Sequence, residues 1–150
     1  MRYIHTDGQD PAFISLCAGL DVYLNELAGG EENRAQYVPL NKLDFIHDAF
    51  VAFDSEIPAG CASFKHFNED TAEVKRVFVK PEYRGRGIAR AILVSLEQTA
   101  KERGYARLVL ETGEPLAAAH RLYLSMGYFV IPNYGPYADM PDSICMEKRL

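Results

Sequence analysis

Residues 77–89 read VFVKPEYRGRGIA, and they lead from an expected strand into the most strongly helical part of the chain. That helix is predicted over residues 87–104, because apolar side chains recur on one face from Ile88 to Ala100. A turn containing Gly85 and Gly87 joins the two elements. The unpaired N–H groups and the positive dipole end of a helix N-terminus attract anions, and glycines let a diphosphate approach the backbone. We therefore predict a diphosphate site at this turn.

The segments on either side predict a mixed α/β arrangement. The polar residues 31–43 predict an ordered loop with a short helical piece. Apolar patterning predicts the remaining elements. The expected strands are Ala49–Phe53, Ala59–Phe67, Ala72–Val79, Ala106–Glu111, Tyr128–Ile131 and Ser143–Leu150, and the other expected helices are Ala12–Leu27 and Pro115–Met126. With a first strand before Ala12, for which the pattern sets no bounds, the expected order is β-α-β-β-β-α-β-α-β-β. It contains only one or two crossovers, which favours a mixed, mostly antiparallel sheet over a doubly wound parallel one.

Length and composition set the class of protein. The chain has 150 residues, of which 48% are hydrophobic, so we expect one domain over residues 1–150. The net charge of −5 and the lack of a Lys/Arg run argue against nucleic-acid binding. No stretch approaches the roughly 18 apolar residues of a membrane span, and the first residues have no leader-like apolar region. We therefore expect a cytoplasmic protein without a membrane partner.

Cysteine and histidine spacing argues against a metal or a disulfide framework. The odd number of cysteines, Cys17, Cys61 and Cys145, is typical of a reducing compartment and of small buried side chains. The four histidines are scattered and lack metal-ligand spacing. We predict that the protein uses no metal.

Two motifs resemble the GNAT superfamily of acyl-CoA-dependent N-acyltransferases. The family signature Arg/Gln-x-x-Gly-x-Gly/Ala matches Arg84, Gly87 and Ala89, and residues 122–128 (LYLSMGY) are similar to its second signature, Leu-Tyr-x-x-x-Gly-Phe/Tyr. The resemblance covers roughly residues 49–150, and the first third matches only in its strand-helix layout. It implies a GNAT-type mixed sheet flanked by helices, with acetyl-CoA as cosubstrate.

The resemblance also implies which residues hold the coenzyme. The main chain of Val77, Phe78 and Val79 is expected to bind the pantetheine arm, and the amides of Arg84, Gly85, Arg86, Gly87, Ile88 and Ala89 the pyrophosphate. Tyr123 falls on the family's tyrosine beside the coenzyme sulfur. Many members carry an asparagine where this chain has Leu116. A polar contact to pantetheine or to the acceptor is therefore either missing or supplied by another residue, with Thr112 and Glu111 as candidates.

The chemistry of acyl transfer suggests two catalytic residues. An alkyl ammonium with a pKa near 10 must lose a proton before it attacks a thioester, and Glu73 is the candidate base because some family members carry one at this distance before the signature arginine. Its alternative is a solvated strand residue paired with Lys75 or Arg76. Tyr123 is the candidate acid for the departing thiolate, with a packed aromatic as the alternative. An acyl-enzyme on Cys61 or Cys145 lacks an accompanying histidine and carboxylate.

Residues 131–141 are rich in Pro, Gly and Tyr, and in this superfamily the corresponding loop often borders the acceptor pocket. Tyr134 and Tyr137 are therefore candidates to line the amine site, with loop packing as the alternative. His120, one helical turn before Tyr123, is either a coenzyme or acceptor contact or a surface histidine.

Together these features predict an N-acetyltransferase that moves an acetyl group from acetyl-CoA to a primary amine of a small molecule, without an acyl-enzyme. The acidic net charge, with Glu73 and Glu111, suggests a cationic amine. The alternatives are a catalytically idle acyl-CoA-binding sensor or assembly domain, and an acetyltransferase of protein lysines or N-termini. The acceptor and the oligomeric state stay open, and a homodimer is common among relatives.

Overall fold

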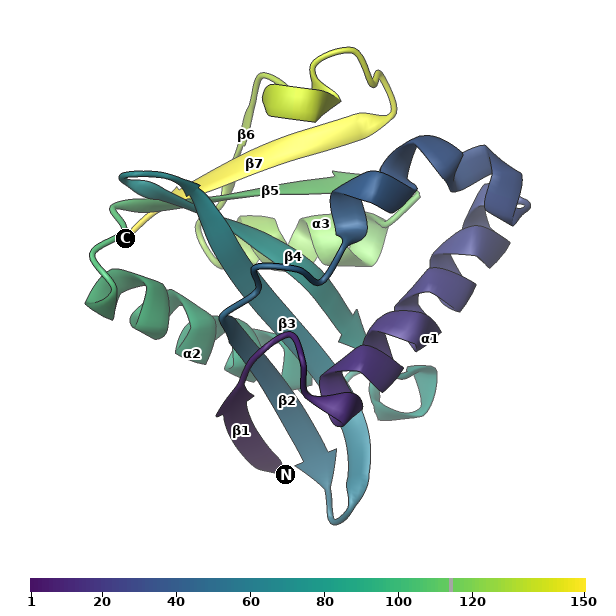
Figure 1. Cartoon of the computed structure of the whole chain (residues 1–150), viewed down its shortest axis with the longest axis vertical. Coiled ribbons are helices and arrows are strands. Elements are labelled where there is room, and N and C mark those ends of the chain that lie inside the picture. Colours follow the sequence, from purple (N-terminus) through teal and green to yellow (C-terminus); the bar gives the residue numbers. More distant parts are fainter. Residues whose placement is uncertain (114) are drawn as a thin grey trace. The chain divides into compact units, whose positions relative to one another are not determined.

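A computed structural model describes residues 1–113 and 115–150 (Figure 1). Its helices are α1 (Pro11–Ala28), α2 (Ile88–Glu102) and α3 (Ala117–Ser125), with 3₁₀ segments η1 (Glu31–Asn41), η2 (Pro81–Tyr83) and η3 (Gly135–Tyr137). Its strands are β1 (Arg2–Thr6), β2 (Asp48–Asp54), β3 (Ile57–Asn68), β4 (Thr71–Val79), β5 (Arg107–Gly113), β6 (Phe129–Ile131) and β7 (Ser143–Arg149). The expected order of strands and helices is confirmed. Residues 31–43 are more regular than expected, because η1 spans eleven of them.

The described strands are hydrogen-bonded in the order β1-β2-β3-β4-β5-β7-β6. The pairs β1–β2, β2–β3, β5–β7 and β6–β7 are antiparallel, and β4 and β5 are parallel. A parallel pair needs a crossover connection, which α2 supplies between β4 and β5. The predicted mixed, mostly antiparallel sheet of the GNAT type is therefore confirmed.

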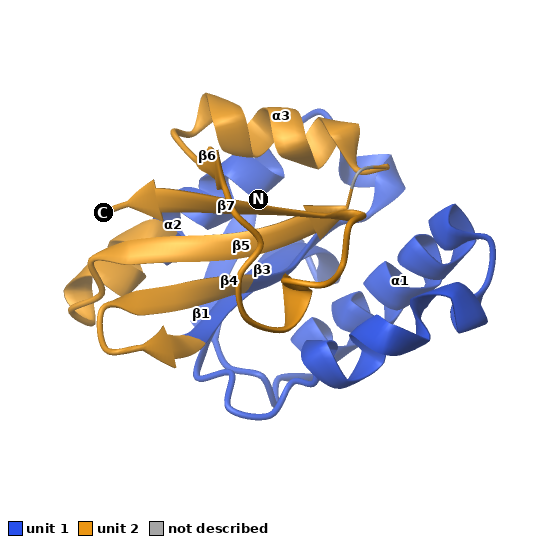
Figure 2. Ribbon diagram, turned by 90° about the horizontal axis from the view of Figure 1, so that it is seen from above, with its two compact units in different colours: residues 1–65, 75–96 blue, residues 66–74, 97–150 orange. Residues whose placement is uncertain are grey.

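Two compact units divide the described residues, and both are discontinuous in sequence (Figure 2). Unit 1 contains residues 1–65 and 75–96, and unit 2 contains residues 66–74 and 97–150. One domain over residues 1–150 stays a prediction.

The core of unit 1 lies where α1 packs on β2, β3 and β4. Asp10 caps the N-terminus of α1 by accepting a hydrogen bond from the Ala12 amide, and Gly29 ends the helix in a left-handed conformation. The buried face of α1 joins strand residues in one apolar cluster, which contains Phe13, Leu16, Cys17, Leu20, Ile46, Ala49, Val51, Cys61 and Phe78.

The register of unit 2 decides which side chains share a face. Glu73 pairs with Val109, and Cys145 pairs with Glu111. Paired residues point to the same side of a sheet and neighbours in sequence to opposite sides, so Glu73, Glu111 and Cys145 share one face. The opposite face carries the buried side chains of Leu110 and Met146. This separation gives unit 2 a polar face and an apolar face.

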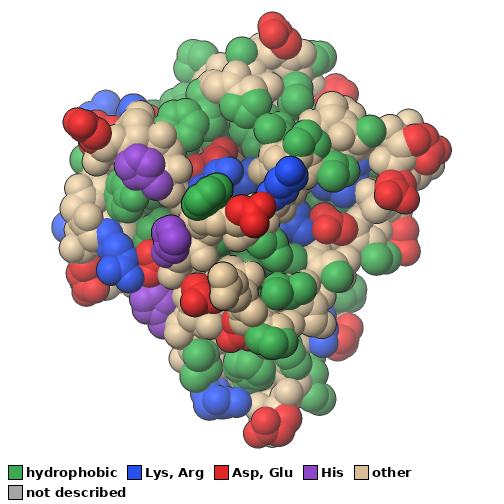
Figure 3. All heavy atoms as spheres, in the orientation of Figure 1, with side chains coloured by type: hydrophobic (Ala, Val, Ile, Leu, Met, Phe, Trp, Pro, Cys, Tyr) green, Lys and Arg blue, Asp and Glu red, His purple; other side chains and the backbone are tan. Residues whose placement is uncertain are grey.

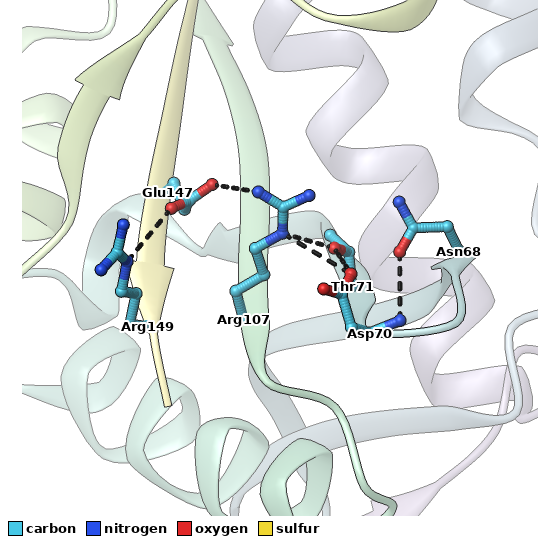
Figure 4. A network of polar contacts seen from close by, with 6 residues as sticks. All are labelled: Asn68, Asp70, Thr71, Arg107, Glu147 and Arg149. Carbon is cyan, nitrogen blue, oxygen red and sulfur yellow. Dashed lines mark hydrogen bonds and ion pairs between the residues drawn. The ribbon is translucent and has the colours of Figure 1, made fainter.

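A polar network ties β4, β5 and β7 together on the polar face (Figure 4). The Arg107 guanidinium donates through Nη1 to the Glu147 carboxylate at 2.9 Å and through Nε to Thr71 Oγ1 at 2.6 Å. Asp70 and Arg149 contribute longer ion pairs of 3.7 and 3.9 Å. Arg107 is thus the cation that connects three strands.

The surface face in Figure 3 carries acidic, basic and apolar side chains intermingled, without one continuous basic patch on that side. Among the described helices, none combines the length and the apolar character that a bilayer crossing requires.

Candidate active site

The glycine turn, residues 84–89, has an open backbone in front of α2. Gly85 and Gly87 have φ values of 78° and 75°, which favour glycine, and a Cβ built on either would meet no atom within 4 Å. At the start of the helix, the first amide that donates a hydrogen bond is that of Ala91, which donates to the Gly87 carbonyl. Within the described part of the chain, the amides of residues 85–89 make no hydrogen bonds. Free amides, open space and a helix N-terminus fit a diphosphate.

Both arginines of the glycine turn contact protein groups. Arg84 Nε donates to the Val79 carbonyl at 2.9 Å, and Arg86 Nη2 donates to the Glu82 carbonyl at 3.3 Å. The Arg84 amide, which the resemblance implies for the pyrophosphate, donates instead to the Pro81 carbonyl at 3.3 Å. The open amides therefore begin at Gly85.

The end of β4 holds the strand residues that the resemblance implies for pantetheine. The Lys80 amide donates to Ala59 of β3 at 2.9 Å. Gly60 lies directly beside this part of β4, since a Cβ there would come within 3.0 Å of the Phe78 carbonyl oxygen. Close packing thus fixes the path of the strand just before the turn.

Glu73 is buried, with only 5% of its surface exposed. The hydroxyl of Tyr134 donates to its Oε2 atom at 2.7 Å. Burial, and then the charge of Glu73, raise the pKa of Tyr134, so this phenol stays a neutral donor. Arg76, the alternative partner of Glu73, donates instead to Asp21 at 2.9 Å and to the Cys17 carbonyl. The structure therefore joins the candidate base to a candidate acceptor-site residue.

The loop of residues 131–141, which we call the late loop, is held by edge-on contacts between aromatic rings. Tyr134 packs edge-on against Phe67 and Tyr137, with ring centroids 5.2 and 5.5 Å apart. The side-chain amide of Asn133 donates to the carbonyls of Tyr137 and Met140. Tyr137 is buried, and the hydroxyl of Tyr134 reaches Glu73, so Tyr134 links the loop to β4.

Tyr123 lies on α3 and is 6% exposed, with its ring edge-on to Tyr128 at 5.6 Å. Burial, and then the charge of Glu111, raise the pKa of the Tyr123 phenol. Among the described residues no group hydrogen-bonds its hydroxyl. Tyr123 is therefore a protonated phenol with an uncommitted proton, and the structure gives no contact between it and Glu73.

Thr112 and Glu111, the two candidates for the polar contact that Leu116 cannot make, differ in their hydrogen bonds. The Thr112 side chain is 4% exposed, and its hydroxyl has no hydrogen-bond partner among the described residues. Glu111 accepts a hydrogen bond from Ser143 Oγ at 2.7 Å. A buried hydroxyl without a partner is costly unless something binds it, so Thr112 fits the polar contact that Leu116 cannot make. His120 is half-buried on α3.

The cysteines are free and buried. Burial raises the pKa of the Cys145 thiol, and the hydrogen bond with Cys17, then burial, raise that of Cys61. Both thiols are therefore poor nucleophiles at neutral pH. Among the described residues no group of three or more His, Cys, Asp or Glu side chains is arranged to hold a metal.

Comparison with known proteins gives the family. The model of the acetyltransferase (GNAT) family matches residues 21–128. An IAA acetyltransferase of Azospirillum brasilense is 35% identical over 143 residues, covering 93% of this chain and 91% of that protein. A Klebsiella pneumoniae protein assigned as an acyl-CoA N-acyltransferase superposes with a TM-score of 0.82 and 29% identity, covering 99% and 97% of the two chains. A Thermoplasma acidophilum PaiA N-acetyltransferase, solved with coenzyme A, shares the fold with a TM-score of 0.74 and 21% identity, over all of both chains. The chain therefore belongs to the acetyltransferase (GNAT) family and is an acetyl-CoA-dependent N-acetyltransferase.

Proposed function

We propose that the acceptor is a primary amine of a small molecule, and that it attacks the acetyl group directly. The observation that carries this proposal is the hydrogen bond between Tyr134 and the buried carboxylate of Glu73. It joins a proton acceptor to the late loop, the segment that borders the acceptor in similar enzymes. An amine that arrives as an ammonium needs such a group to take its proton.

The residues of the glycine turn and of β5 have binding roles in this proposal. The amides of residues 85–89 hold the diphosphate, and the Thr112 hydroxyl takes a polar contact from the coenzyme. When bound, acetyl-CoA supplies the activated acetyl group and a thiolate leaving group. The Val79 amide at the end of β4 stabilises the negative charge that develops on the acetyl oxygen.

Tyr123 supplies the proton to the leaving sulfur in this proposal. Its raised pKa makes it a weak acid in isolation. Loss of solvent also disfavours a bare thiolate, so the phenol proton passes to the sulfur as the carbon–sulfur bond breaks, and the negative charge moves to the Tyr123 oxygen. The proton that the amine nitrogen loses as the amide forms then restores the phenol. The uncommitted Tyr123 proton supports this role.

One observation supports a small acceptor, and a second supports a cationic one. The relative named IAA acetyltransferase matches nearly the whole chain, so the similarity includes the N-terminal third as well as the coenzyme motif. The net charge of −5 favours a cationic amine over a phosphorylated or strongly acidic acceptor. A cytoplasmic location is proposed from the three free buried cysteines, which suit a reducing compartment.

A panel of amines, screened for acetyl-CoA-dependent release of thiol, tests the proposal. Amino acids, polyamines, aromatic amines and lysine-containing peptides form the panel, and Gly87→Glu is the negative control. We expect turnover with a small cationic amine. Turnover with peptides alone would make the chain a protein acetyltransferase, and coenzyme binding without any turnover would make it a sensor. A clear preference for acidic acceptors would contradict the charge assignment.

A further inference from the structure

Tyr23 lies on α1 beside the glycine turn. The Arg84 guanidinium carbon is 4.5 Å from the centroid of the Tyr23 ring, which is within the range of a cation–π contact. The same guanidinium is 6.0 Å from the Phe78 ring, and the Tyr23 and Phe78 rings are 6.4 Å apart. Arg84 therefore lies against two aromatic rings, one from α1 and one from β4.

Arg84 also ties the turn to the strand before it. Its Nε atom donates to the Val79 carbonyl at 2.9 Å, while the next amide, that of Lys80, donates to Ala59 at 2.9 Å. The peptide between Val79 and Lys80 is thus held on both sides. The open amides begin one residue after Arg84, so the Arg84 side chain anchors the residue at the start of the proposed diphosphate site.

The position of Tyr23 is fixed by close packing of α1 on β4. One helical turn earlier, a Cβ on Gly19 would come within 3.3 Å of the Phe78 ring, so the backbone of α1 lies against the Phe78 side chain there. Tyr23 itself packs against the same apolar cluster. Arg84, in contrast, is exposed, and an exposed arginine has many rotamers. The fixed ring of Tyr23 therefore restrains a side chain that would otherwise be mobile.

We propose that Tyr23 is a positioning residue for coenzyme binding. Its ring holds Arg84 against Val79 and so keeps the amides of residues 85–89 arranged for a diphosphate before the coenzyme arrives. Ordering done in advance reduces the entropic cost of binding. This inference rests on the proposed diphosphate site, and it gives a role to a residue of the N-terminal third.

Calorimetric titration with coenzyme A tests the inference. Tyr23→Leu keeps apolar volume but removes the aromatic face, and we expect the Kd to rise about 3- to 10-fold. The KM for acetyl-CoA should rise by a similar factor, without a comparable fall in kcat. Tyr23→Phe keeps the ring and should restore the wild-type Kd. Val22→Ala, an exposed neighbour on α1, is the matched control and should not change the Kd.

A double-mutant cycle shows whether Tyr23 acts through Arg84. Arg84→Gln changes an exposed side chain and should raise the Kd in a folded protein, and adding Tyr23→Leu should then have little further effect. Fully additive effects, a wild-type Kd in Tyr23→Leu, or a loss in kcat alone would each overturn the inference. Failure of the wild-type chain to bind coenzyme A would overturn the diphosphate site itself and the inference with it.

Discussion

The hydroxyl of Tyr134 donates a hydrogen bond of 2.7 Å to the Glu73 carboxylate, joining residues 61 positions apart in the chain. Tyr134 is half-buried and Glu73 is buried, so little water competes for this contact. A neutral donor fixes the orientation of the carboxylate that accepts its hydrogen bond. The link makes Tyr134 a positioning residue for the proposed base.

Tyr134→Phe removes that donor and keeps the ring. We expect kcat/KM to fall about 10-fold, because the carboxylate loses the donor that orients it, and we expect little further loss when Tyr134→Phe is added to Glu73→Gln. Tyr105→Phe removes a surface phenol that contacts His66 and is the matched control. Equal losses from Tyr134→Phe in the wild type and in Glu73→Gln would show that Tyr134 does not act through Glu73.

Glu73→Gln removes the proposed base and keeps nearly the same volume. Turnover should fall most near neutral pH, where the amine is protonated, and should partly recover as the pH approaches the amine pKa of about 10. The measurement is a pH profile of kcat/KM with the best amine found. A uniform loss at every pH would assign Glu73 to structure or binding instead.

Tyr123→Phe separates binding from chemistry. The ring packing against Tyr128 is kept and only the hydroxyl is lost, so coenzyme affinity should survive while kcat falls by about 10²- to 10⁴-fold. The raised pKa keeps the wild-type phenol protonated through the assay range, so no alkaline loss of activity below about pH 10 should come from Tyr123. Full turnover in this variant would remove Tyr123 from the mechanism.

The elements and the glycine turn could be predicted from sequence because their signals are local. The apolar stripe of α2 and the glycines at 85 and 87 each depend on neighbouring residues. The partners of Glu73 and Arg76 could not be predicted in this way, because Tyr134 and Asp21 lie 61 and 55 positions from them. Strand register and helix placement bring such pairs together. Tyr23 lies inside the expected helix Ala12–Leu27, and no local pattern links it to Arg84.

Arg107 is predicted to contribute more to stability than its exposure suggests. Its side chain is 40% exposed, but it is the 2.9 Å partner of the Glu147 carboxylate, which is 8% exposed. Arg107→Met would leave a buried charge without this partner, at a cost of about 1–3 kcal/mol. Arg149→Met removes an 84% exposed partner at 3.9 Å and should cost less than about 0.5 kcal/mol. Urea unfolding measures both, and equal costs would contradict the role given to Arg107.

Gly87→Glu tests the diphosphate site with a control that the chain itself provides. Gly87 and Gly104 share positive φ values, 75° and 92°, and a Cβ on either meets no atom within 4 Å. Either substitution should therefore cost about 1–2 kcal/mol of backbone strain without a steric clash. Gly87→Glu also brings a carboxylate to the open amides in front of α2, so coenzyme A binding should be abolished. Position 104 lies just after the C-terminus of α2, at the end away from the open amides. The Gly104→Glu variant should therefore bind coenzyme A like the wild type. Calorimetry on both folded variants decides, and equal affinities would mean that the diphosphate does not bind at the glycine turn.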